Sequence, residues 1–182
     1  MLTRTVAASA CLGLPFFALP IAVLAMPSSP DLGKAEGQCR KGEGGPAFLV
    51  TPIGLKDRTG NLKLEVYPAN GDDFLADDNI LLMAGKTFRR VEVPVPRSGA
   101  VSLCIRVPAP GAYAVSLLHD RDSDRRFGWR IDGIGFSGNP KLGWGKPNVA
   151  KATARAGAGL TPIRIILNYR RGLGVAPLKR GE

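Results

Sequence analysis

Alternation of hydrophobic and polar residues with a period of two dominates the chain beyond residue 46. In NLKLEVYP, residues 61–68, Leu62, Leu64 and Val66 alternate with polar or amphipathic side chains. The same alternation recurs in RRVEVPV (89–95), AVSLCIRV (100–107), AYAVSLLH (112–119) and TPIRIILNY (161–169). Such a pattern is typical of strands with one face on a core. It predicts that Tyr113, Val115 and Leu117 face the core.

Two further segments, PAFLVTPIG (46–54) and NVAKATARA (148–156), bring the expectation to about seven strands. Turn-forming residues separate the strands at 59–61, 98–99 and 108–111. Only GDDFLADDNILLMAGK (71–86) is compatible with a helical turn. Closely spaced strands with such turns predict an all-β fold, an antiparallel β-sandwich of about seven strands.

One connection, residues 120–147, is much longer than the others. It contains four aspartates and both tryptophans of the chain, together with several glycines. Loops of this length are usually functional or hold structure of their own. We therefore expect one long Gly/Asp-rich loop that is ordered and in which Asp120, Asp122 and Asp124 have a structural role.

The N-terminus has the features of an export signal. Arg4 precedes an apolar run that ends at Val23-Leu24-Ala25, small residues suited to cleavage. We expect a signal peptide at 1–25, a flexible arm at 26–46, the sandwich at 47–171 and a tail at 172–182. The protein would then be exported, to the periplasm or outside the cell. The alternative is that residues 1–25 stay as a membrane anchor.

The cysteines and the net charge lead to two further expectations. Removal of residues 1–25 leaves Cys39 and Cys104, which we expect to form a disulfide in an oxidising compartment. The alternative is a pair of free buried thiols. The net charge of +10 favours attraction to an anionic cell-envelope surface, and the alternative is that it serves only solubility. The chain lacks any nucleic-acid-binding motif.

A family resemblance rests on three stretches of the chain, VPAPGAYAVSLLHDRDSDRRFGW (107–129), GIGFSGNP (133–140) and WGKPN (144–148), with the last strand IRIILNY (163–169). These resemble the DUF2141 family of exported bacterial proteins. The matching residues are Pro110, Gly111, Tyr113, His119, Asp120, Gly133, Gly135, Phe136, Ser137 and Asn139, with Gly138 as an insertion. The resemblance implies an exported sandwich of transthyretin-like or immunoglobulin-like type, without an assigned activity.

The stretch HDRDSDRRFGW (119–129) raises the question of a metal site. Asp120, Asp122 and Asp124 give the D-x-D-x-D spacing that begins many calcium loops, and Asp132 offers a fourth carboxylate. Two departures stand out, since the sixth position of the loop is Arg125 rather than glycine and the twelfth is not glutamate. The alternative is a turn in which the carboxylates accept backbone N–H groups and pair with Arg121, Arg125 and Arg126.

Other residues of this stretch suggest binding or catalysis. The side chains of His119, Trp129, Phe136 and Trp144 could line a sugar or protein surface. The alternative is a small core that holds the loop down. A hydrolase built on His119 and the aspartates lacks an obvious nucleophile.

We therefore expect a non-enzymatic binding or structural module of the bacterial cell envelope. The second hypothesis is a secreted calcium-dependent or carbohydrate-binding module, with calcium as the candidate cofactor. Its partner would be an envelope surface, a glycan or an envelope protein. A hydrolase ranks third.

Overall fold

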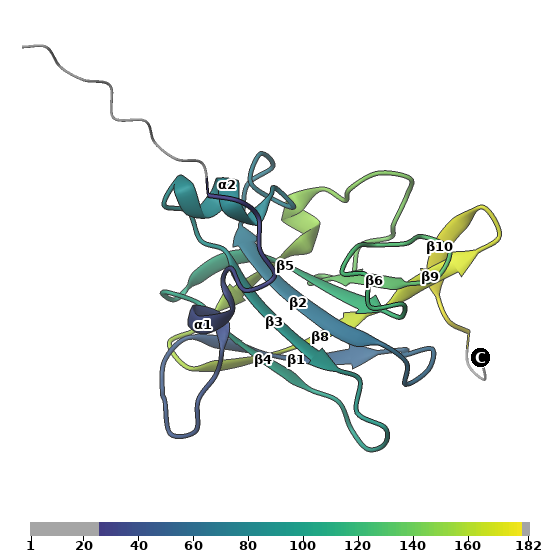
Figure 1. The fold of residues 1–182 in the computed structure, drawn as a ribbon, viewed down its shortest axis with the longest axis horizontal. Coiled ribbons are helices and arrows are strands. Elements are labelled where there is room, and N and C mark those ends of the chain that lie inside the picture. Colours follow the sequence, from purple (N-terminus) through teal and green to yellow (C-terminus); the bar gives the residue numbers. More distant parts are fainter. Residues whose placement is uncertain (1–25, 180–182) are drawn as a thin grey trace, which may run out of the picture.

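The protein consists of two β-sheets packed face to face in the computed structural model, which describes residues 26–179 (Figure 1). The small sheet has the strand order β4-β1-β8, and the large sheet has the order β10-β9-β6-β5-β2-β3, with β7 also paired to β5. The strands are β1 (Ala47–Ile53), β2 (Asn61–Pro68), β3 (Arg89–Pro94), β4 (Leu103–Arg106), β5 (Gly111–Asp120), β6 (Gly133–Phe136), β7 (Thr153–Ala156), β8 (Leu160–Ile166), β9 (Asn168–Arg171) and β10 (Gly174–Pro177). The helices are α1 (Lys34–Gly37), α2 (Asp78–Met83) and a 3₁₀ turn, η1 (Val149–Ala152).

The predicted antiparallel sandwich is confirmed in outline. Strand β2 pairs antiparallel with residues 113–120 of β5 over its whole length, which places Leu62 opposite His119 and Leu64 opposite Leu117. The described chain has ten strands rather than about seven, and one pair, β1 and β8, is parallel. The segment predicted as one last strand divides at Leu167, because β8 belongs to the small sheet and β9 to the large one.

The main core lies between the two sheets and uses the alternating residues. Its members come from both sheets and include Phe48, Val50, Leu62, Leu64, Val66, Ile105, Val115, Leu117, Ile165 and Tyr169. Val115 and Leu117 are fully buried, and Tyr113 is 8% exposed, so the prediction that these residues face the core is confirmed. Burial of a large apolar side chain contributes about 1.5–3 kcal/mol to the free energy of unfolding. A shift of one residue would move all of these side chains to the other face, so their burial fixes the strand register.

The large sheet also carries a second apolar cluster on its other face. Here Tyr67 packs edge-to-face on Phe74 and Phe88, and Phe74 packs on Phe136. Consequently β5 is buried on both faces from Tyr113 to Asp120, whereas the alternation predicted one solvated face. The second face is covered by chain segments around α2 and η1, which supply Leu81 and Ala152 to the cluster.

The segment predicted as a flexible arm has more structure than its composition indicated. It forms α1, accepts a backbone hydrogen bond from Arg90 at Gly33 and pairs Gln38 with Ile105. The predicted disulfide joins Cys39 to Cys104, with a Cα–Cα distance of 5.8 Å. The expected tail contains β10, which extends the large sheet beside β9.

The proposed signal peptide lies outside the described residues. Between residues 26 and 179, none of the helices has both the length and the apolar character needed to cross a membrane.

Candidate functional site

The four aspartates singled out in the long connection come together at the end of β5. One carboxylate oxygen from each of Asp120, Asp122, Asp124 and Asp132 lies within 4.8 Å of the others. Asp120 is the last residue of β5, and Asp132 directly precedes β6, so the antiparallel pairing of these two strands brings both into the group. Asp120 and Asp132 are buried, while Asp122 and Asp124 are exposed on the turn between them.

Backbone N–H groups of the turn hold the carboxylates in place. Asp120 Oδ2 accepts a hydrogen bond from the Arg125 N–H at 2.9 Å, and Asp124 Oδ1 accepts from the Arg126 N–H at 2.7 Å. Asp132 accepts from the N–H groups of Arg121 and Gly128 through its two oxygens. Asp120, Asp124 and Asp132 therefore accept backbone N–H groups of the turn, as expected of aspartates with a structural role.

Arg125 adopts the backbone conformation that a glycine would adopt. Its φ is 69°, in the left-handed region, and Ser123 has a φ of 60°. Glycine at the sixth position of a calcium loop serves to make this bend, so the arginine does not prevent the loop from closing. The twelfth position, Ile131, is exposed, and the fourth carboxylate comes instead from Asp132, one residue later.

The arginines of the turn do not neutralise these carboxylates. Arg121 forms an ion pair with Asp57 at 2.5 Å, and Arg125 forms one with Glu92 at 2.7 Å. Among residues 26–179, no ion pair to Asp120, Asp122, Asp124 or Asp132 is found. The alternative in which the arginines pair with the cluster is therefore wrong, whereas its backbone hydrogen bonds are present.

Asp120 carries the strongest electrostatic conflict of the group. It is fully buried, and its Oδ1 has no hydrogen-bond partner within the described part of the chain. Burial raises the pKa of Asp120 above its ordinary value, and the hydrogen bond from the Arg125 N–H offsets part of this rise. The charges of Asp132 and Asp124 and the side chain of Asp122 raise the pKa further. Like charges this close oppose ionisation unless a proton or a cation balances them. The arrangement can therefore hold a hard cation through oxygen ligands alone.

His119 lies in the core on the opposite face of β5 from Asp120. Its Nδ1 accepts a hydrogen bond from the Tyr169 hydroxyl at 2.7 Å, and its Nε2 donates to the Thr59 carbonyl at 2.9 Å. Tyr169 keeps its proton, because burial raises the pKa of its hydroxyl to about 12. Both ring nitrogens are thus engaged, and the side chain is fully buried.

We expect His119 to make the stability of the protein depend on pH. Burial lowers the pKa of His119 below its ordinary 6.5, so the unfolded chain binds a proton more readily than the folded protein. The free energy of unfolding should therefore fall as the pH drops below about 6.5. Thermal unfolding between pH 5 and 7.5 would show this slope, and His119→Gln should flatten it; parallel profiles for the two proteins would contradict the assignment.

The predicted aromatic set does not form one surface. Phe136 is 5% exposed and packs on Phe74 in the second cluster, so it offers little surface of its own. Trp129 is partly exposed, and the guanidinium groups of Arg130 and Arg170 lie over its ring at 5.5 Å and 4.8 Å from the ring centroid. Trp144 is 83% exposed. Together with the burial of His119, this leaves only the two tryptophans accessible, on separate parts of the surface.

The glycines after Asp132 explain how the last part of the connection packs. A Cβ on Gly133 would lie 2.3 Å from the Tyr169 ring, and one on Gly135 would lie 2.5 Å from the Ile166 carbonyl oxygen. The connection is therefore not one loop, since β6 lies within it and inserts between β5 and β9. A strand of four residues was too short for the period-two pattern to reveal.

Comparison with protein families supplies the context for this geometry. The model of an uncharacterised family conserved in bacteria, DUF2141, matches residues 50–164, which is more than half of the chain. The chain belongs to the DUF2141 family. No curated protein matched this sequence, and no solved structure did.

The DUF2141 match includes the whole aspartate cluster and β6. Within it, Ser137 donates a hydrogen bond to the Ala152 carbonyl, and Asn139 accepts one from the Ile166 N–H at 2.7 Å. Gly138, the insertion in the stretch GIGFSGNP, has a φ of 75°, and a Cβ there would lie 2.5 Å from the Lys151 carbonyl oxygen. These contacts hold the end of β6 against the neighbouring segments. The stretch therefore has a structural role next to the aspartate cluster.

Sequence reasoning missed several residues that shape the site. Asp57 holds the Arg121 side chain away from the aspartates, and Thr59 and Tyr169 fix His119. Tyr169 could have been placed near His119, because each lies on the core-facing side of a predicted strand. Asp57 lies in an irregular turn, and no local pattern connects it to Arg121.

Proposed function

We propose that this DUF2141 protein is a non-catalytic module of the bacterial cell envelope in which Asp120, Asp122, Asp124 and Asp132 bind a calcium ion. The ion holds the connection between β5 and β6 in its folded shape, so that the surface around it can act as a binding surface. Calcium fits because it takes six to eight oxygen ligands with flexible geometry, whereas magnesium demands a stricter octahedron.

The single observation that carries this proposal is the state of Asp120. Its side chain is fully buried, its Oδ1 has no hydrogen-bond partner, and three other carboxylates approach within 4.8 Å. An unpaired buried carboxylate oxygen costs folding free energy, in the range of about 1–3 kcal/mol for an unsatisfied polar group and more when it is charged. A bound cation would satisfy the oxygen and cancel the repulsion in one step.

Two observations support the envelope setting and the absence of catalysis. The Cys39–Cys104 bridge suits an oxidising compartment. The apolar N-terminal run suits export to such a compartment. His119 is buried with both ring nitrogens engaged, so it is not poised to act as a general base for a hydrolase.

Calcium should raise the melting temperature of the purified, disulfide-intact protein. At a free concentration one hundred times the dissociation constant, binding adds about 2.7 kcal/mol to the free energy of unfolding. This corresponds to a shift of about 5–10 °C for a domain of this size, which chelation with EGTA should reverse. Hydrogen exchange within residues 120–132 should slow in the same titration.

Asp122→Asn and Asp72→Asn form a matched pair of variants, because both residues are exposed aspartates and only Asp122 belongs to the cluster. Without calcium, Asp122→Asn should unfold at the wild-type temperature or slightly above it, since one repelling charge is gone. With calcium, it should lose most of the shift, while Asp72→Asn should keep it. A wild-type protein that does not respond to calcium, or an Asp122→Asn variant that responds fully, would disprove the site.

A further inference from the structure

A second surface feature lies next to the aspartate turn and shares Arg125 and Arg126 with it. It is a pocket of about 520 Å³ against the outer face of the large sheet. Its walls are mostly apolar and include Leu118, Ile134, Phe136, Leu142, Phe127 and Trp144. Ligand pockets typically enclose about 300–1,000 Å³ with a largely apolar lining, so this one has the size and character of a binding site.

The rim of the pocket is basic. Lys63, Arg125, Arg126 and Lys146 line it, against the single acidic residue Glu65. Three of these four cations are already engaged with the protein. Lys63 lies 3.5 Å from Glu65, Arg125 pairs with Glu92, and Lys146 donates to the carbonyls of Gly71 and Phe74.

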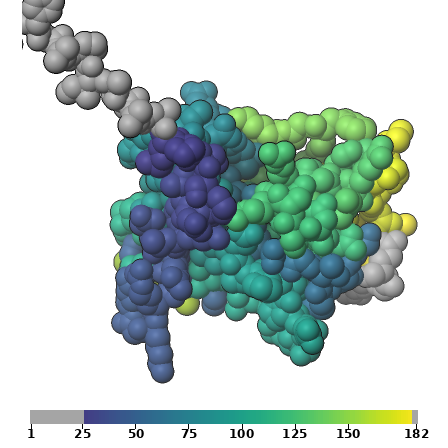
Figure 2. All heavy atoms as spheres, viewed as in Figure 1, coloured from purple at the N-terminus to yellow at the C-terminus, as the bar shows by residue number. Residues whose placement is uncertain are grey.

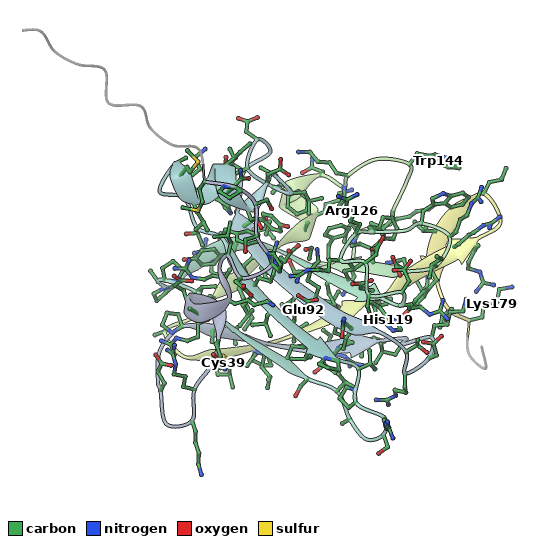
Figure 3. All side chains as sticks on the ribbon, viewed as in Figure 1. Cys39, Glu92, His119, Arg126, Trp144 and Lys179 are labelled. Carbon is green, nitrogen blue, oxygen red and sulfur yellow. A yellow bond between two sulfur atoms is a disulfide. The ribbon has the colours of Figure 1, made fainter. Side chains whose placement is uncertain are left out.

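Arg126 differs from its neighbours. It is exposed, and within residues 26–179 its guanidinium group has no hydrogen-bond or ion-pair partner, although its backbone N–H binds Asp124. The next residue, Phe127, is a large hydrophobic residue with 43% of its surface exposed. Figure 3 shows Arg126 and Trp144 in the upper half of the view, whereas Cys39 lies at lower left; both Arg126 and Trp144 line the pocket.

We propose that this pocket binds a single-chain amphiphile with an anionic head group, its apolar chain lying along Leu118, Ile134 and Leu142 and its head group paired with Arg126. The apolar walls match an acyl chain, and they offer few of the polar side chains that a sugar requires. The basic rim matches the charge of a carboxylate or phosphate head, and a guanidinium group binds either one through paired N–H donors.

Trp144 offers a direct readout of this binding. Its side chain is 83% exposed, so a bound chain would move it from water into an apolar contact. The only other tryptophan, Trp129, is not among the residues that line the pocket. A Trp129→Phe protein keeps an aromatic ring beside Arg130 and Arg170 and leaves Trp144 as the sole tryptophan.

The test is a fluorescence titration of the Trp129→Phe protein with dodecanoate and with dodecyl phosphate, both kept below their micelle concentrations. We expect a saturable shift of Trp144 emission to shorter wavelength with both ligands. The neutral detergent dodecyl maltoside and inorganic phosphate alone should bind at least fivefold more weakly, since one lacks the charge and the other lacks the chain. Carboxylate and phosphate heads are distinguished by their relative affinities.

Two charge-matched variants complete the test in the same background. Arg126→Gln should weaken dodecanoate binding by about fivefold or more, as expected for the loss of one ion pair at a partly exposed site. Arg155→Gln removes an exposed arginine of β7 that does not line the pocket, and it should leave the affinity unchanged. The proposal is overturned if Trp144 does not respond, if dodecyl maltoside binds as tightly as dodecanoate, or if Arg126→Gln binds like the wild type.

Discussion

Replacing both Cys39 and Cys104 with serine is expected to lower the free energy of unfolding by about 4 kcal/mol. The bridge closes a loop with a sequence separation of 65 residues, and a cross-link of this length removes much conformational freedom from the unfolded chain. In the folded protein it fastens the segment before β1 to β4, beside the pairing of Gln38 with Ile105. Few other single features of the chain contribute as much.

Urea unfolding of the oxidised wild type and of the double serine variant would measure this loss. Reduction of the wild type should reproduce it, whereas the serine variant should not respond to reductant. Hydrogen exchange in residues 31–40 should quicken in the variant, because the bridge restrains that segment. A loss below about 1 kcal/mol would contradict a bridge that stabilises the fold by closing a long loop.

Substitution of Gly60 by alanine is the second change with a large expected effect. Gly60 forms the turn before β2, with a φ of 74°, and a Cβ there would lie 2.0 Å from the carbonyl oxygen of Asp120. A left-handed conformation costs an alanine about 1–2 kcal/mol, and the clash with backbone adds strain that no side-chain rotation relieves. We expect a total loss of about 3 kcal/mol.

Gly99→Ala is the matched control for this substitution. Gly99 has a φ of 82°, and a Cβ there would have no heavy atom of the described structure within 4 Å. It should therefore lose only the conformational part, about 1 kcal/mol. Chemical unfolding of both variants separates the two contributions. Equal losses at the two positions would mean that the turn at Gly60 does not press on the end of β5.

The same contact links the turn to the aspartate cluster. Gly60 lies against the backbone of Asp120 and Arg121, and the preceding Thr59 carbonyl accepts the hydrogen bond of His119. A shift of this backbone would move the buried Asp120 carboxylate, whose Oδ1 has no hydrogen-bond partner among the described residues. Gly60→Ala should therefore also reduce the calcium-induced rise in melting temperature, whereas Gly99→Ala should preserve it.

The N-terminal segment covers the same region from outside. In Figure 2 the purple residues after position 25 lie against the green residues of the long connection. The contact is specific, since Arg125 donates to the Pro30 carbonyl at 3.2 Å and Arg90 donates to the carbonyls of Ser29 and Pro30. The aspartate turn is therefore buttressed by a segment far from it in sequence.

The period-two alternation of the sequence was by itself enough to determine the main core of this protein. A strand with one face on a core must place apolar side chains at every second position, so Leu62, Leu64, Val115 and Leu117 could be assigned to that face. The D-x-D-x-D spacing likewise identified three of the four clustered carboxylates, and Asp132 was added from its place in the same connection. The pairing of Cys39 with Cys104 followed from the expectation that residues 1–25 are removed, and the bridge is present in the structure.

Only the tertiary structure decided which partners these residues meet. Alternation describes one face of a strand, so it could not show that β5 is buried on both faces by segments around α2 and η1. Local spacing suggested that Arg121 and Arg125 balance the aspartates, but long-range packing gives them Asp57 and Glu92 instead. Charge pairing depends on distances across the fold, and these distances leave Asp120 buried with an oxygen that has no protein partner.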